Sequence, residues 1–239
     1  METLKLEKKQ TKMIAHRGLS GLEKENTCLA FVAAANRSYY GIETDVHLTK
    51  DGTFVICHDF NTGRVSNVNL EIKDTNFSDL RNINLYDINS NETKPYIKIP
   101  TLKEYLSICL KYNKHCIIEV KPKFSKEEIQ KLLDEVKEIN ELKNTTFISF
   151  SLENLKKIRS INESIPLQYL TSIYTNELPE ICKREKVDID ILFSQLTKEN
   201  MECFKNNNIV VNAWTVNNLE DANKLVSFDI DFITTNILE

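Results

Sequence analysis

Four short pairs of polar residues interrupt otherwise apolar runs in the first 121 residues of this 239-residue sequence. Their residue types can move protons, bind a metal ion or hold an anion. Residues two positions apart in an extended strand point to the same face, so the two members of each spaced pair would act together. The pairs are His16 with Arg17, Glu43 with Asp45, His58 with Asp59, and Glu119 with Lys121.

The carboxylates of Glu43, Asp45 and Glu119 would repel one another if they met at one site, so a positive group must keep them ionised. A hard divalent cation prefers such oxygen ligands, and an all-carboxylate set favours Mg²⁺ or Ca²⁺, with Mn²⁺ as an alternative, over Zn²⁺. Arg17 and Lys121 add two cations beside the metal. This combination indicates an anionic substrate group, above all a phosphate.

His16 and His58 add an acid–base pair whose ordinary pKa suits neutral pH. Cleavage of a phosphodiester needs charge neutralisation, an activated nucleophile and a protonated leaving oxygen, and the combined set can supply all three. Each residue alone is weak evidence, because a lone histidine in a strand is more often structural. We interpret His47 and His115, which lack such neighbours, as structural.

The composition limits the partners of the chain. With 31 Lys and Arg against 35 Asp and Glu, the net charge is −4, and no basic cluster indicates nucleic-acid binding. No apolar run approaches the roughly 18 residues of a membrane span, and the N-terminus lacks the apolar stretch of a secretory signal. Six cysteines without metal-ligand spacing predict free, mostly buried thiols in the cytoplasm.

Short β-branched or aromatic runs alternate with amphipathic helix patterns, which predicts a parallel sheet. About eight such repeats in about 240 residues favour a (β/α)8 barrel over an open sheet, and active sites of such barrels lie at the carboxyl ends of strands. Capping boxes predict helices after Thr101 and Ser125, and we expect Ser151 and Asn217 to cap two more. The nine candidate strands are 13–15, 42–46, 54–58, 116–120, 146–150, 167–170, 189–193, 209–214 and 231–234.

Nine candidates for eight places leave one extra strand. The link between 42–46 and 54–58 is too short for a crossover helix and carries a turn sequence at 50–53, so we expect a hairpin there. With a two-residue turn, Asp45 would lie opposite His58. Residues 60–99 are weakly patterned and follow directly, so they predict a small insertion that is either a binding loop or a plain surface loop.

The order of motifs strongly resembles the glycerophosphodiester phosphodiesterases over almost the whole chain. The block from 16 to 59 carries the most specific part of the resemblance. The matching strings are His16-Arg17-Gly18, Glu25-Asn26-Thr27, Ile42-Glu43-x-Asp45, His58-Asp59, Glu119-x-Lys121-Pro122, Trp214-Thr215-Val216-Asn217 and Ile233-Thr234-Thr235-Asn236.

The resemblance implies one domain, residues 1–239, with a distorted TIM barrel and a small insertion at about 60–99 after the third strand segment. It implies that Glu43, Asp45 and Glu119 bind the divalent metal and that His16 and His58 are the acid–base residues. By the same resemblance, the side chains that hold the substrate are Arg17, Lys121 and Trp214, although Trp214 could equally be a core residue.

The expected activity is the metal-dependent hydrolysis of glycerophosphodiesters, such as glycerophosphocholine or glycerophosphoethanolamine, to glycerol 3-phosphate and an alcohol. One alternative is a related barrel phosphodiesterase of the phospholipase C or D kind. The other is a catalytically silent barrel that binds phosphodiesters. The substrate would be a small molecule, and the sequence does not indicate an oligomeric state.

Overall fold

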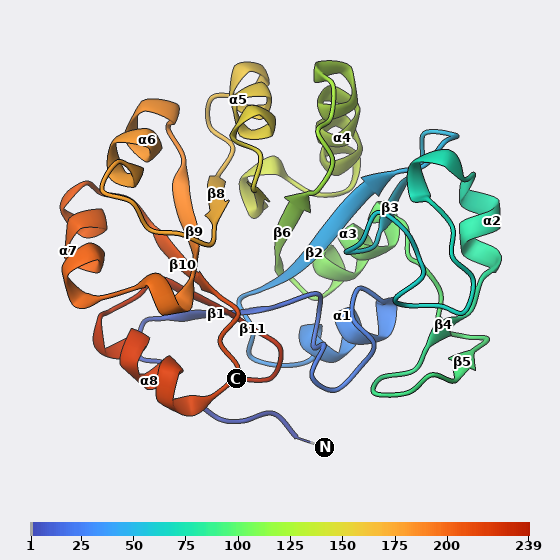
Figure 1. Cartoon of the computed structure of the whole chain (residues 1–239), viewed down its shortest axis with the longest axis horizontal. Helices are drawn as coiled ribbons and strands as arrows, with labels where there is room; N and C mark the ends of the chain where they lie inside the picture. Colours follow the sequence, from blue (N-terminus) through green and yellow to red (C-terminus); the bar gives the residue numbers. More distant parts are fainter. Residues whose placement is uncertain (1) are drawn as a thin grey trace.

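All nine expected strands form in the computed structural model, which describes residues 2–239. Eight of them run parallel in a closed ring, because β1 pairs with both β11 and β2, and the (β/α)8 prediction is therefore confirmed (Figure 1). In order around the ring, the strands are β1 (Lys12–Ala15), β2 (Gly41–Leu48), β6 (His115–Val120), β7 (Thr145–Ser149), β8 (Leu167–Thr171), β9 (Asp188–Leu192), β10 (Val211–Trp214) and β11 (Phe232–Thr235).

A helix lies in each connection between successive barrel strands. Both expected capping boxes are present, at Thr101 and Ser125. Ser151 occupies the N-cap position of its helix, but the expected cap at Asn217 is wrong: Asn218 accepts the hydrogen bond from Asp221 N. The helices are α1 (Cys28–Ala35), α3 (Leu102–Lys111), α4 (Lys126–Ile139), α5 (Leu152–Ile161), α6 (Leu178–Glu185), α7 (Lys198–Asn206) and α8 (Leu219–Ser227).

The extra strand is β3 (Phe54–Ile56), which forms the expected antiparallel hairpin with β2. Its register differs by one residue from the expectation: Cys57, not His58, lies opposite Asp45, and Cys57 N donates to Asp45 O. The turn has three residues because Gly52 adopts a left-handed φ of +78°, a conformation typical of three-residue hairpin loops. His58 therefore lies one position beyond the pair.

Apolar side chains fill two separate layers. The larger one packs between the strands and the surrounding helices. The smaller one lies inside the barrel, because alternate residues of a strand point to opposite faces. Its buried members are Ile14, Ile117, Ile148 and Leu170.

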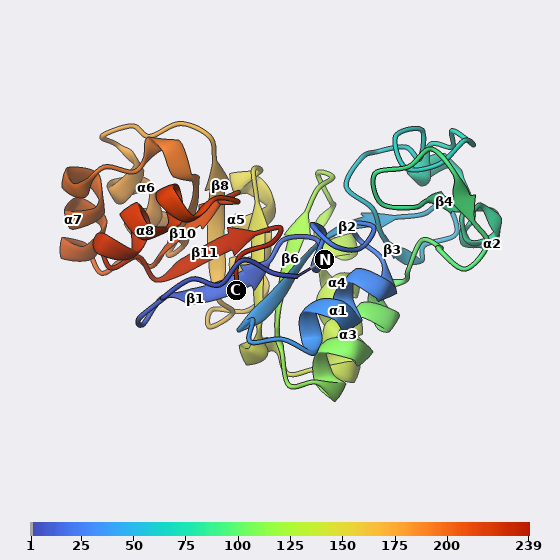
Figure 2. The same ribbon diagram turned by 90° about the horizontal axis from the view of Figure 1, so that it is seen from below.

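The insertion, residues 60–99, has a small core of its own. It contains α2 (Phe77–Asn82) and a two-stranded sheet of β4 (Leu85–Tyr86) and β5 (Thr93–Lys94), and it lies to one side of the barrel beyond β3 (Figures 1 and 2). Leu80 is among its fully buried residues. Arg81 anchors the insertion to α3 through two hydrogen bonds to the Glu104 carboxylate, of 2.9 and 2.7 Å.

All six cysteines are free, and four of them are buried. Among residues 2–239, no helix is long and apolar enough to cross a bilayer. The two chain ends lie side by side, since Leu6 N donates to the carbonyl of Glu239 at 2.8 Å.

We predict that Leu80→Ala opens the insertion before the barrel. Truncation of a fully buried leucine costs about 2–5 kcal/mol, and the small separate core of the insertion must bear that loss. Hydrogen exchange should therefore accelerate over residues 60–99 while the barrel strands stay protected. Leu106→Ala, in the layer between strands and helices, is the matched control and should destabilise the barrel itself. Equal loss of protection in both regions of the Leu80 variant would contradict the prediction.

Candidate active site

Three carboxylates meet at the carboxyl ends of β2 and β6. The two strands are parallel neighbours, and their register places Asp45 directly beside Glu119, with Glu43 two residues earlier on the same face. One oxygen of each side chain lies within 4.8 Å of the others, and all three residues are buried. We call Glu43, Asp45 and Glu119 the acidic triad.

The loop after β1 supplies donors to this triad. Arg17 adopts a left-handed φ of 55°, and its backbone N–H donates to Glu43 Oε2 at 2.7 Å. Asn26 Nδ2 donates to Asp45 Oδ2 at 2.7 Å. Gly18 permits this loop to pass against α1, since a Cβ there would lie 2.6 Å from the backbone of Ala30. The backbone of Arg17 and the side chain of Asn26 thus donate hydrogen bonds to two of the three carboxylates.

Two cationic side chains complete the charge pattern. The Arg17 Nε atom lies 3.5 Å from Asp45 Oδ2. Lys121 Nζ lies 3.1 Å from Glu119 Oε1 and 3.5 Å from Asp45 Oδ1. Both side chains are largely shielded from solvent, with 18% and 13% of their surface exposed, so their charges act in a medium of low dielectric. Three negative groups therefore face two positive ones.

The pKa values of the triad reflect this excess of carboxylates over cationic side chains. Burial, followed by repulsion from Asp45, raises the pKa of Glu43 well above its usual value and that of Glu119 to about 8. Burial also opposes ionisation of Asp45, but Arg17 and Lys121 lower its pKa to about 2. The protein groups alone thus keep one carboxylate of the triad ionised and hold the other two as acids.

The donor set fits a hard divalent cation. Asp45 Oδ1 is buried and accepts no hydrogen bond, and its ion pair with Lys121 Nζ is long at 3.5 Å, so this oxygen retains the capacity to bind a ligand. A cation among three carboxylate oxygens would ionise the whole triad and remove the repulsion. Oxygen-only ligands suit Mg²⁺, Ca²⁺ or Mn²⁺.

His16 follows β1 and lies at the same end of the barrel. Its Nδ1 donates to Asn236 Oδ1 at 2.7 Å, which leaves Nε2 as a proton acceptor. Asn236 is held in turn by Asn217, whose Oδ1 accepts from the backbone N–H of Asn236. Burial and then the neighbouring Arg17 lower the pKa of His16 to about 4, so the ring is neutral at pH 7.

His58 has a carboxylate partner instead of an amide. Its Nδ1 lies 2.6 Å from Asp59 Oδ1, and Arg64 Nε lies 2.6 Å from the other oxygen of Asp59. Burial lowers the pKa of His58, and Arg17 and Lys121 lower it further, while Asp45 and Asp59 oppose that shift only in part. A carboxylate beside Nδ1 stabilises the doubly protonated ring, as a proton donor requires.

One arginine from the insertion connects both halves of the site. Arg64 donates two hydrogen bonds of 2.8 Å to the carboxylate of Glu25, besides its bond to Asp59. Glu25 also accepts from Arg17 at 3.0 Å. A single guanidinium therefore helps to orient both the Arg17 side chain and the Asp59 carboxylate that contacts His58.

A small cavity of about 60 Å³ opens between these groups, which we call the site cavity. His16, Arg17, Glu43, Glu119 and Lys121 form its charged side together with His58, and the opposite wall is mainly apolar. The lining includes no residue of the insertion. The residues of the opposite wall are Ile148, Phe150, Leu170, Asp190, Trp214 and Thr234.

Trp214 both lines the site cavity and packs against the apolar layer inside the barrel. Its indole meets the Phe150 ring edge to face, with centroids 5.6 Å apart, and its Nε1 donates to the Asp190 carbonyl at 3.3 Å. The indole thus packs as a core residue and also forms part of the cavity wall, and its contact with the substrate stays a prediction.

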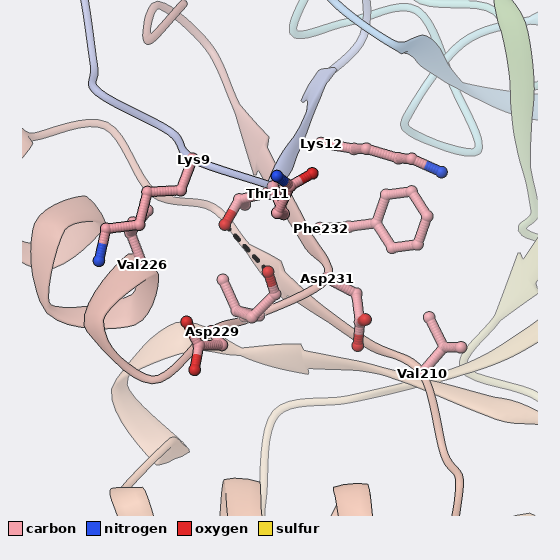
Figure 3. Close-up of a pocket in the computed structure, with 10 residues that line it drawn as sticks. Lys9, Thr11, Lys12, Val210, Val226, Asp229, Asp231 and Phe232 are labelled. Atoms are coloured by element: carbon pink, nitrogen blue, oxygen red, sulfur yellow. Dashed lines mark hydrogen bonds between the residues drawn. The ribbon is translucent and has the colours of Figure 1, made fainter.

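A larger hollow of about 360 Å³ lies at the opposite end of the barrel, at the amino ends of β1, β10 and β11 (Figure 3). Its acidic side chains are already used or exposed; Asp231 Oδ2, for example, accepts from Val211 N at 2.9 Å. Lys12 lies over the ring of Phe232 and not beside an anion-binding group. The chemistry therefore identifies the smaller site cavity as the candidate active site.

The two remaining histidines lie outside the site cavity. His47 packs edge-on against Phe60, and its Nε2 contacts the carbonyl of His58 at 3.4 Å. His115 is at the amino end of β6, stacked on Tyr40 and bonded to Thr146 Oγ1.

Sequence reasoning assigned no role to several residues that shape the site. Glu25, Asn26, Asp59 and Asn236 stood within the quoted motifs, and their polar character inside those strings was a usable signal. Arg64 was assigned no role, because one of its two partners, Glu25, lies 39 residues away in the sequence. Asp190 could have been noticed as a charged residue between two isoleucines in an apolar strand.

Comparison with known proteins identifies the family of the chain. The sequence profile of the Glycerophosphoryl diester phosphodiesterase family matches residues 16–239. A glycerophosphodiester phosphodiesterase of Caldanaerobacter subterraneus is 28% identical over 234 residues, which cover 95% of this chain and 94% of that protein.

Solved structures agree on the fold. A glycerophosphodiester phosphodiesterase from Thermotoga maritima is 27% identical, with a TM-score of 0.76 over 95% of this chain and 94% of that one. A phosphodiesterase from Oleispira antarctica, solved with its product sn-glycerol-3-phosphate, superposes with a TM-score of 0.88 at 24% identity and covers 95% of this chain and 93% of its own. The family match extends over nearly the whole chain, so the chain belongs to the glycerophosphoryl diester phosphodiesterase family and is a phosphoric diester hydrolase.

Proposed function

We propose that this chain works as one domain that hydrolyses glycerophosphodiesters to glycerol 3-phosphate and an alcohol, with His16 and His58 as the acid–base pair and a divalent metal on the acidic triad. Glycerophosphocholine and glycerophosphoethanolamine are the proposed substrates. The observation that carries the proposal is the convergence of three carboxylates, two cations and two histidines around one cavity. We also propose the cytoplasm as its location, since six free thiols suit a reducing compartment.

The charged side of the site cavity would hold the phosphate. Arg17 and Lys121 both line the cavity, so an anion bound there gains two charge-assisted contacts. A divalent cation on the acidic triad supplies further neutralisation of the negative charge that develops on the phosphate oxygens. The surrounding burial strengthens every one of these contacts.

The partners of the two histidines support different roles. His16 is neutral, with Nε2 available, so it suits the general base that accepts a proton from the attacking group. His58 is paired with a carboxylate, so it suits the general acid that protonates the departing oxygen. The Asp59–Arg64–Glu25 contacts hold the acid in place during this transfer.

Phosphorus NMR tests the proposal directly. Purified protein incubated with a panel of glycerophosphodiesters should produce the glycerol 3-phosphate resonance. Conversion of intact phospholipids alone would instead support the phospholipase-like alternative, and binding without any turnover would support the silent barrel.

We predict that activity requires a divalent cation. EDTA should abolish turnover and Mg²⁺, Mn²⁺ or Ca²⁺ should restore it, because only a cation ionises the whole triad at neutral pH. Glu43→Gln should remove this metal response while preserving the hydrogen bond from Arg17 N. Full activity of the chelated wild-type protein would contradict the proposed metal.

The same substitution should stabilise the metal-free protein. The folded pKa of Glu43 lies above its unfolded value near 4.5, so the folded state holds a proton that the unfolded state releases. The stability contributed by this group is complete below about pH 4.5 and is lost as pH rises. The Glu43→Gln variant should thus gain an advantage over wild type that grows between pH 5 and 8. Calorimetry in EDTA should therefore show a Tm difference between the variant and wild type that increases with pH.

Lys121→Ala should weaken both substrate binding and turnover. The ammonium lies beside two triad carboxylates and helps more as negative charge develops on the phosphate. Loss of one such contact costs about 2–4 kcal/mol, or roughly 30- to 1,000-fold in kcat/KM. Lys131→Ala, an exposed lysine outside the site cavity, is the control, and an unchanged kcat/KM for Lys121→Ala would remove Lys121 from the site.

The leaving group should separate the two histidines. An alkoxide needs a proton in the transition state, whereas p-nitrophenolate does not, so His58→Ala should lose about 10²–10⁴-fold on glycerophosphocholine and far less on a p-nitrophenyl diester. His16→Ala should lose activity on both substrates. The reversed pattern would exchange the two roles, and equal losses throughout would defeat the assignment.

A further inference from the structure

Asp190 lies on the wall of the site cavity that faces the acidic triad. In the closed ring, β9 is four strands away from β2 in either direction, so the two strands are diametrically opposite. Ile189 and Ile191 belong to the layer beneath the helices, so the alternation of the strand directs Asp190 into the barrel. Only 1% of its surface is exposed, and it lines the site cavity.

The surroundings of Asp190 do not satisfy its carboxyl group. Its Oδ1 is buried and has no hydrogen-bond partner. Leu170 flanks it in register on β8, and Asn212 flanks it on β10. Asn212 contacts the Asp190 carboxyl group and also donates to Thr234 Oγ1 at 3.0 Å, so only the Oδ1 atom of Asp190 is left without a partner. Trp214 contacts only the backbone carbonyl of Asp190.

A buried carboxyl oxygen without a partner destabilises the folded state, and no hydrogen bond to Asp190 Oδ1 offsets that cost. Burial, and then repulsion from Glu119, raises the pKa of Asp190 well above its usual value. The neighbouring cavity wall is apolar at Ile148 and Leu170, so an apolar residue at position 190 would suit the packing better. The carboxyl group therefore points to a ligand.

We propose that Asp190 is a specificity-determining residue that binds a free hydroxyl group on the glycerol portion of the substrate. The inference rests on the proposed function and extends it from the phosphate to the glycerol portion of the substrate. A hydroxyl can both donate to and accept from a carboxyl group, so it satisfies the orphaned oxygen in either protonation state.

Charge and size exclude the other occupants of this subsite. A phosphate belongs to the opposite side of the cavity, where the cations Arg17 and Lys121 lie. The site cavity has about 60 Å³, far less than the roughly 300–1,000 Å³ of pockets for drug-sized ligands. A hydroxymethyl arm fits this space better than a trimethylammonium group.

A matched pair of substrates tests the inference. Wild-type protein should prefer glycerophosphocholine to its deoxy analogues, propane-1,2-diol and propane-1,3-diol phosphocholine, by about 10- to 100-fold in kcat/KM for the analogue that lacks the bound hydroxyl. Asp190→Ala should lose this preference through a lower kcat/KM on glycerophosphocholine, with little change on that analogue. Asp190→Asn keeps the shape and one hydrogen-bonding oxygen, so it should retain part of the preference and serves if the alanine variant fails to fold.

Gln168→Leu is the control, because Gln168 is also buried with an unpartnered oxygen but does not line the site cavity. It should leave the preference unchanged. An Asp190→Ala protein that keeps the wild-type preference would overturn the inference. The inference would also be overturned if Asp190→Ala changed only the preference between choline and ethanolamine head groups. That result would mean that Asp190 contacts the cationic head group instead of a hydroxyl. A wild-type protein inactive on every glycerophosphodiester would overturn the proposed function as well.

Discussion

Repulsion among three buried carboxylates determines how this end of the barrel is built. The register of β2 and β6 places Asp45 beside Glu119. The two residues therefore stay neighbours as long as the strands are paired. Arg17, Lys121 and Asn26 surround the ionised Asp45, while Glu43 and Glu119 depend on protons or on a cation. The proposed metal binding and the local stability therefore depend on the same cluster.

The cations that balance this cluster are themselves held by a second layer of charge. Arg64 of the insertion contacts Glu25 and Asp59, and these carboxylates contact Arg17 and His58 respectively. The insertion thus influences the site without lining the cavity. Its small separate core gives this arginine a fixed position, which a loose surface loop could not provide.

Much of this architecture could be predicted from local sequence patterns. Strand runs, capping boxes and the spacing of Glu43 and Asp45 depend only on residues that are close in the sequence, so they can be recognised without the structure. The hairpin register failed by one residue because it depends on whether Gly52 takes a left-handed conformation. Neighbouring asparagines, with the same capping chemistry, made Asn217 and Asn218 indistinguishable. Arg64 and Asp190 were missed because their roles depend on residues that only the closed barrel brings near.

The closed ring also divides the site cavity into two unlike walls. Strands β2 and β6 and the loop after β1 carry its charges, whereas β7, β8 and β10 contribute Ile148, Leu170 and Trp214. An apolar wall beside a charged one excludes water and lowers the local dielectric, so each cation acts more strongly on a bound phosphate. The same wall offers few polar contacts to the glycerol portion of a substrate. In our proposal, the charged wall holds the phosphate common to all phosphodiesters, and Asp190 on the other wall selects those with a glycerol hydroxyl group.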